Sequence, residues 1–109
     1  MKNGPLKNDS GDKIYYLNDK IHREDGPAIE CANDHKRWYI NDKLHREDGP
    51  AVEWTNGTKQ WYLNDQRHRK DGPAIEFIDG TKVWYLNDKK IECTTQQEFE
   101  RLLKLKAFW

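Results

Sequence analysis

Hydrophobic and polar residues alternate along most of this chain with a period of two. In the segment 60–64, Trp61 and Leu63 fall on one side of an extended strand and Tyr62 falls on the other. The segment 51–54 alternates in the same way. Alternation that uses aromatic and β-branched residues is typical of half-buried strands. The pattern therefore predicts short antiparallel strands over most of the chain.

Two sequence landmarks recur at an interval of 23 residues. The first is the motif His-Arg-x-Asp-Gly-Pro-Ala, which begins at His22, His45 and His68. The second is aromatic-Tyr-aliphatic-Asn-Asp, which begins at Tyr15, Trp38, Trp61 and Trp84. Two independent landmarks in one register indicate internal repetition. We predict a single domain, with a degenerate leading repeat over 1–14 and three full repeats plus a final strand over 15–90.

Turn residues separate the predicted strands. Asn56-Gly57 and Asp79-Gly80 are pairs that tolerate positive φ, and Asn33-Asp34 takes this place in the second unit. The Asn-Asp pair after each aromatic strand marks the opposite set of turns. Proline cannot donate a ladder hydrogen bond, so we expect a bulge or bend at each Asp-Gly-Pro. The fold class is then mostly β, an antiparallel meander of repeated β-hairpins forming an elongated sheet.

The period changes in the tail. Thr95 and Glu98 fit a capping box, in which both side chains satisfy free backbone N–H groups at a helix start. Phe99, Leu102 and Leu103 follow at helical spacing. We predict one C-terminal α-helix within 94–109, running from about 96 to 108, that covers the last sheet edge or an open apolar face.

The alternation also predicts two faces for the sheet. The expected core face carries the apolar residues of both strand types: Trp38, Ile40, Trp61, Leu63, Trp84, Leu86, Val52, Trp54, Ile75 and Phe77. The expected contact face carries Tyr16, Tyr39, Tyr62 and Tyr85 with Glu30, Glu53 and Glu76. The side on which the His-Arg pairs lie depends on the bend, because one extra residue moves a side chain to the other face.

Composition narrows the class of protein. Lys+Arg and Asp+Glu both number 19, and this balance argues against general nucleic-acid binding. Only 35% of residues are hydrophobic, yet five Trp, five Tyr and three Phe are present, so we expect a thin aromatic core. Cys31 and Cys93 form no CxxC pair and are interpreted as reduced thiols. No apolar run reaches membrane-spanning length and the first residues lack a signal peptide, which predicts a cytoplasmic protein without membrane insertion.

The His-Arg pairs admit three interpretations. In the structural one, each Arg pairs with an acidic residue of the adjacent repeat and each His packs on a neighbouring ring, a demand that recurs in every unit. In the second, Arg and aromatic faces hold the phosphate and base of a nucleotide. The third is metal or acid–base chemistry. Catalysis needs one constellation of unequal groups, whereas these are near-copies, so we predict no enzyme, no cofactor and no metal site. His35 occurs once, in a turn, and is interpreted as solvated.

The 23-residue period, the Asp-Gly turn and the Trp-Tyr-aliphatic-Asn strand resemble the MORN-repeat superfamily, in its variant repeats. The fuller unit resembles repeats in small uncharacterised proteins of tailed phages and giant viruses. The resemblance covers about residues 15–90. It implies a chain of β-hairpins in an elongated, curved sheet that serves as a protein-interaction or scaffolding surface; lipid binding has also been suggested for such repeats.

These observations lead to one functional hypothesis and two alternatives. The first is a non-enzymatic binding protein, phage-encoded, that occupies a host defence or regulatory protein in the host cytoplasm. The first alternative is a sponge that sequesters a small nucleotide signal through Arg, His and aromatic residues. The second is a structural module that self-associates as a homo-oligomer. Tyr and Arg are typical interface anchors, so the predicted contact residues are Tyr39, Tyr62, Tyr85, His45, Arg46, His68 and Arg69.

Overall fold

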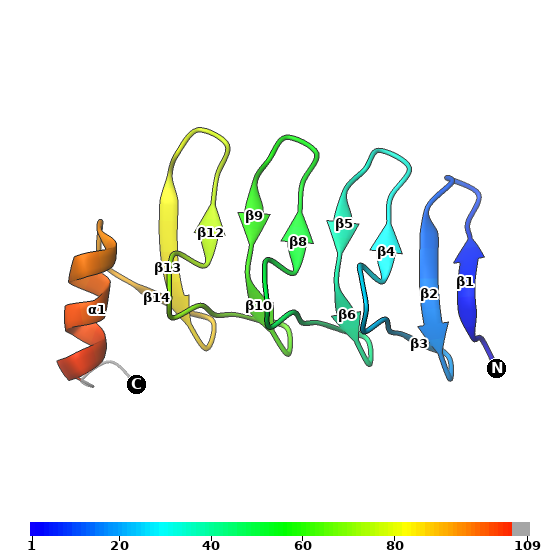
Figure 1. Ribbon diagram of the computed structural model, residues 1–109, viewed down its shortest axis with the longest axis horizontal. Helices are drawn as coiled ribbons and strands as arrows, with labels where there is room; N and C mark the ends of the chain where they lie inside the picture. Colours follow the sequence, from blue (N-terminus) through cyan, green and yellow to red (C-terminus); the bar gives the residue numbers. More distant parts are fainter. Residues whose placement is uncertain (106–109) are drawn as a thin grey trace.

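The computed structural model describes residues 1–105, and within them hairpins stand side by side in a row that ends in a helix (Figure 1). The strands are β1 (Gly4–Lys7), β2 (Lys13–Leu17), β3 (Lys20–Ile21), β4 (Ile29–Glu30), β5 (Lys36–Arg37), β6 (Tyr39–Ile40), β7 (Lys43–Leu44), β8 (Val52–Glu53), β9 (Lys59–Gln60), β10 (Tyr62–Leu63), β11 (Gln66–Arg67), β12 (Ile75–Glu76), β13 (Lys82–Leu86) and β14 (Lys89–Ile91). The helix is α1 (Gln96–Leu105).

Strand order follows chain order. The main sheet runs β1-β2-β4-β5-β8-β9-β12-β13-β14, with β3 on β2, and the pairs β6–β7 and β10–β11 extend the middle units. The ladders are antiparallel. The predicted meander of hairpins with one C-terminal helix is confirmed. The molecule measures 47 × 29 × 18 Å, so most of it is a single layer of sheet. No helix within residues 1–105 has the length and apolar character needed to cross a bilayer.

Both predicted sets of turns are present, with different conformations. Each Asn-Asp pair has positive φ at both residues, as a two-residue type I′ hairpin requires. At the opposite end of the hairpins, only the second residue of each turn pair has positive φ. This residue is Gly57 or Gly80, and in the second unit it is Asp34. There the backbone of Trp54 bonds that of Thr58, so the loop holds three residues, 55–57, rather than two. The chain also bends at Asp-Gly-Pro, as expected.

The longer loop changes the register between the two strands of a unit. Val52 lies opposite Gln60 in the ladder, and also opposite Arg37 of the preceding strand. Side chains opposite each other share a face and sequence neighbours do not, so Trp61 points away from the face of Val52. The expected core face is therefore wrong: the apolar residues of the two strand types lie on opposite faces. Phe77, expected in the core, is 41% exposed.

We call the two sides the Trp face and the Tyr face. The Trp face carries Trp38, Trp61 and Trp84. It also carries a row of alternating charge across the sheet, formed by Lys13, Glu30, Lys36, Glu53, Lys59, Glu76 and Lys82. The Tyr face carries Tyr16, Tyr39, Tyr62 and Tyr85 with Val52 and Ile75, both buried. The glutamates expected beside the tyrosines thus lie on the Trp face, because the register is shifted by one residue.

Backbone hydrogen bonds join each unit to the next at the Asn-Asp turns. The Oδ1 atom of Asp42 accepts from the N–H of Ile21 at 2.7 Å, and the Asp42 N–H donates to the carbonyl of Ile21 at 2.9 Å. Asp65 and Asp88 repeat this arrangement. In the leading unit Lys2 takes the place of Ile21 opposite Asp19. The joint between units is therefore the same along the whole row.

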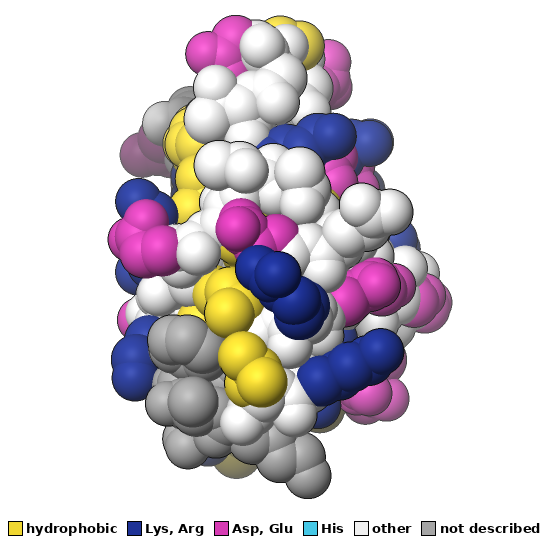
Figure 2. All heavy atoms as spheres, turned by 90° about the vertical axis from the view of Figure 1, so that its left-hand side faces the viewer, with side chains coloured by type: hydrophobic (Ala, Val, Ile, Leu, Met, Phe, Trp, Pro, Cys, Tyr) yellow, Lys and Arg dark blue, Asp and Glu magenta, His cyan; other side chains and the backbone are white. Residues whose placement is uncertain are grey.

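The C-terminal end holds the largest apolar cluster of the described residues. Trp84, Leu86, Ile91 and Phe99 are buried together, with Cys93, Leu102 and Leu103 packed against them. The N–H of Glu98 donates to Thr95 Oγ1 at 3.1 Å, and the Glu98 carboxylate accepts from Thr94 N–H at 2.9 Å. The capping box thus starts α1 as predicted, and the predicted helix end at 108 lies outside the described residues. Seen from this end, positively and negatively charged side chains are interspersed around a small group of apolar ones (Figure 2).

Candidate binding grooves

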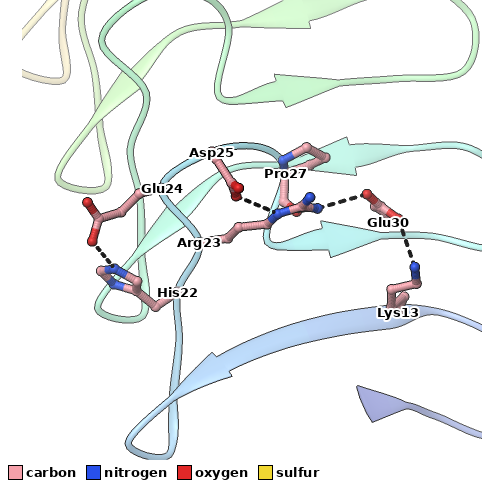
Figure 3. Close-up of polar contacts among 7 residues, drawn as sticks. All are labelled: Lys13, His22, Arg23, Glu24, Asp25, Pro27 and Glu30. Atoms are coloured by element: carbon pink, nitrogen blue, oxygen red, sulfur yellow. Dashed lines mark hydrogen bonds and ion pairs between the residues drawn. The ribbon is translucent and has the colours of Figure 1, made fainter. Parts of the chain in front are cut away.

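Each arginine of the repeated motif is held by its own unit. The Arg46 guanidinium lies over the Trp38 ring, with Cζ 3.9 Å from the ring centroid. Its Nε donates to Asp48 Oδ1 at 3.0 Å, and its Nη1 donates to the Pro50 carbonyl at 3.0 Å and to Glu53 Oε2 at 3.1 Å. Arg23 and Arg69 repeat these contacts on Tyr15 and Trp61. Figure 3 shows the first copy.

The glycine of the motif lets the arginine pack closely against the main chain. A Cβ atom added at Gly49 would lie 2.8 Å from Cζ of Arg46, and the same distance is 3.0 Å at Gly26 and 2.5 Å at Gly72. The guanidinium is thus packed between a ring and a glycine. The motif residues Arg, Asp, Gly and Pro therefore form one local arrangement around the guanidinium, which we call the arginine clamp. The alanine that follows the proline is fully buried in each copy, at Ala28, Ala51 and Ala74.

Each histidine of the motif joins its unit to the next. His45 Nδ1 accepts from the N–H of Asn64 at 3.1 Å, and its Nε2 lies 3.3 Å from Glu47. An accepting Nδ1 places the proton of the neutral ring on Nε2. His22 and His68 make the same bond to Asn41 and Asn87. Burial, and then the charge of Lys70, lowers the pKa of His68.

These contacts favour the structural interpretation of the His-Arg pairs, with one change. The arginines pair with acidic residues of their own unit rather than of the adjacent one, and the histidines make the link between units.

His35, predicted to be solvated, is bonded instead: its Nδ1 accepts from Thr55 N–H at 2.8 Å, and its ring meets Trp54 edge-on at 4.7 Å. The interpretation of His35 as solvated is wrong. Its position in the repeat was the sequence signal for this role. Asp12 and Thr58 stand at the same position in the neighbouring units, and their side chains also accept a hydrogen bond from the backbone of the next unit.

The predicted contact residues are divided between the two faces. His45, Arg46, His68 and Arg69 line grooves on the Trp face. Tyr39, Tyr62 and Tyr85 lie on the Tyr face, where Arg67 stacks on Tyr85 at 4.2 Å and donates to its hydroxyl at 3.2 Å. Burial raises the pKa of Tyr39 and Tyr62. Their role in binding a partner stays a prediction, but one surface does not hold all seven.

Two shallow grooves lie on the Trp face, one unit apart. The first has a volume of about 910 Å³ and a floor of Trp38 and Ile40, between the motif segments 22–27 and 45–48. The second has a volume of about 600 Å³ and a floor of Trp61 and Leu63. The rim is exposed and mostly acidic: the side chains of Glu24 and Glu47 are 80% and 85% exposed, and at the second groove Lys70 stands beside Asp71. The grooves thus combine a half-buried apolar floor with a negative rim.

Neither metal chemistry nor a relative assigns a role to these grooves. Within residues 1–105, no three His, Cys, Asp or Glu side chains are placed to hold a metal ion. The free thiols Cys31 and Cys93 have pKa values raised by burial, which disfavours the reactive thiolate. Comparison with protein-family models, with curated proteins and with solved structures found no match.

Proposed function

We propose that this protein is a non-enzymatic scaffold that binds a protein partner along its Trp face. The observation that carries the proposal is the pair of like grooves set one repeat apart. Each offers an apolar floor and an exposed acidic rim, a combination that suits a protein surface with apolar anchors and basic residues around them. Repetition gives such a partner two equivalent contact points on one rigid row.

The nucleotide sponge receives less support from the same geometry. The guanidinium of Arg46 already donates to three oxygen acceptors, and the Arg46 side chain is only 22% exposed. A phosphate that bound Nε or Nη1 would have to displace Asp48 or Glu53, and the exposed acids at the rim would repel it. We therefore propose that the arginines shape the grooves rather than bind an anion.

Two further features of the proposal come from the sequence. Near-identical grooves with equivalent members lack the unequal groups that acid–base catalysis needs, so we propose binding without turnover. The resemblance to phage and giant-virus repeats motivates the more specific proposal of a host protein as partner, blocked by steric occupancy.

Capture from host lysate on tagged full-length protein tests the proposal. The groove variant carries Glu24→Lys and Glu47→Lys, and the matched control carries Asp9→Lys and Glu92→Lys, with the same change in net charge. We expect a specific partner to be retained by wild type and control and lost from the groove variant. Failure to retain any specific partner, or equal retention by all three, would contradict the proposal. A thermal shift with any nucleotide would instead favour the sponge.

A further inference from the structure

The sheet contains a third copy of the groove, and the chain fills it with its own helix. The floor of this copy is Trp84 and Leu86, the counterparts of Trp38 with Ile40 and of Trp61 with Leu63. Phe99 of α1 is 0% exposed and lies over this floor, 6.3 Å from the Trp84 ring. Ile91 completes the cluster. The occupant of one groove is therefore known.

Polar contacts place the helix against the wall of the groove as well as its floor. Gln96 Oε1 accepts from Trp84 Nε1 at 2.7 Å, and Gln96 Nε2 lies 3.4 Å from the carbonyl oxygen of Lys70. Lys70 is the counterpart of Glu24 and Glu47, which line the first two grooves. The helix thus contacts the segment that forms the rim elsewhere.

The sequence changes where the helix replaces a further repeat. Ile91 and Glu92 stand at the His and Arg positions of the motif, so no arginine covers Trp84 and Phe99 packs there instead. In the first two grooves the arginine covers one side of the ring, while Trp38, Ile40, Trp61 and Leu63 remain only half-buried. At both grooves the arginine takes the place of Phe99 on the ring, and the part of the apolar floor that the arginine leaves open remains accessible.

The rim charge differs in a way that selects the occupant. In the third copy, Glu100 accepts from Gln96 Nε2 at 3.0 Å, which sets this acid beside the main chain of Lys70. In the first two copies the corresponding rim residue is the exposed Glu24 or Glu47. A helix docked over the open side of the floor would lie beside this carboxylate, whereas α1 lies beside the main chain of Lys70. The α1 helix of a second copy would bring Glu100 against this carboxylate, which is unfavourable.

We infer that the first two grooves bind an amphipathic α-helix of a partner protein, with an aromatic residue followed by leucines three and four positions later and a lysine or arginine at the position of Glu100. This inference rests on the proposed function and names the class of partner. Helix-in-groove recognition of this kind reads anchors at helical spacing.

Peptide titration of the full-length protein, followed by NMR of the Ile40, Leu63 and Leu86 methyl groups, tests the inference. The probe spans residues 94–105 with Glu100→Lys, and the comparison peptides keep Glu100 or add Phe99→Ala to the probe. We expect the probe to shift the Ile40 and Leu63 signals. The peptide that keeps Glu100 should bind at least about threefold more weakly, the scale of exposed charge pairs, and the Phe99→Ala peptide should not bind. The Glu24→Lys, Glu47→Lys variant should lose this preference, and the Asp9→Lys, Glu92→Lys control should keep it.

Other results would overturn the inference. Unmoved Ile40 and Leu63 signals, or a shift confined to Leu86, would mean that the first two grooves do not take a helix. Tighter binding of the peptide that keeps Glu100 would identify a second copy as the occupant. If lysate capture still yields a partner that depends on Glu24 and Glu47 while the peptides leave both methyl signals unmoved, the proposed function stands and the helical partner is wrong.

Discussion

Arginine, glycine and histidine account for most of the repeated motif at the scale of single residues. Arg46 packs against a ring and against Gly49, and its Nε and Nη1 atoms donate to Asp48, Pro50 and Glu53. The histidine then ties the unit to the next turn. From the sequence, packing was one of three interpretations of these residues. The sequence could not show which partner each would find, because Asp48 and Glu53, two and seven residues after Arg46, both bind it.

Gly49→Ala tests the close fit of the arginine clamp. The added Cβ would overpack the guanidinium, so we expect a loss of about 1–3 kcal/mol in the free energy of unfolding. In an Arg46→Ala background the same change should cost less than about 0.5 kcal/mol, because the clashing group is gone. Urea denaturation of the wild type, the two single variants and the double variant gives the coupling free energy between the two positions. Equal costs in both backgrounds would mean that glycine serves another purpose.

His68 makes stability depend on pH. Its folded pKa lies below its ordinary value, so the unfolded chain binds the proton more readily than the folded chain. The stability contributed by neutral His68 is complete above about pH 6.5 and is lost as the pH falls through the folded pKa. His68→Asn keeps an acceptor, as Asn3 does for Asn18 in the leading unit at 2.9 Å. Between about pH 7.5 and 5 the wild type should lose more stability than this variant; equal losses would contradict the role of His68.

Turns set the register at the scale of elements. Periodicity predicted the strands, turn residues predicted both sets of turns, and helical spacing with a capping box predicted the helix. It failed on which residues share a face, because Asn56-Gly57 is typical of a two-residue turn while the chain forms a three-residue loop. That single residue moves Val52 from the Trp face to the Tyr face. Local sequence did not distinguish the two loops, and the ladder pairing with neighbouring units decides between them.

Asp65→Ala probes the joint between units at the Asn-Asp turn. Asp65 has φ of 67° and its carboxylate accepts from Leu44 N–H at 2.7 Å. Removing the acceptor and placing alanine in the left-handed region should cost about 1–3 kcal/mol. Asp65→Asn keeps an acceptor and tolerates positive φ, so its cost should be clearly smaller. Thermal unfolding of both variants measures the difference, and a harmless Asp65→Ala would contradict this account of the joint.

A single-layer sheet needs something to end it at the scale of the whole molecule. At the N-terminal end Lys2 and Asn3 reproduce the backbone and acceptor contacts of a preceding unit. At the C-terminal end α1 covers Trp84 in place of a further arginine clamp. The sequence predicted a covering helix from its period and capping box. The groove that it fills could not be predicted, because the faces were assigned incorrectly.

Phe99→Ala tests how far α1 stabilises the row. Phe99 is buried against Trp84, Leu86 and Ile91, so we expect a loss of about 3–5 kcal/mol. Leu105→Ala is the matched control, because Leu105 is 62% exposed and should change little. Light scattering should also detect association of the Phe99 variant through the uncovered apolar cluster. A Phe99 variant as stable and monomeric as the control would contradict the covering role.

The central claim is that the repeated arginines are structural and shape the grooves without binding anions. NMR of the arginine Nε–H groups tests it most directly. Arg23, Arg46 and Arg69 lie within 3.9 Å of ring centroids, so their Nε–H signals should be shifted by the rings, protected from exchange and unchanged when a nucleotide triphosphate is added. Unshifted, rapidly exchanging signals that move with added nucleotide would contradict the account.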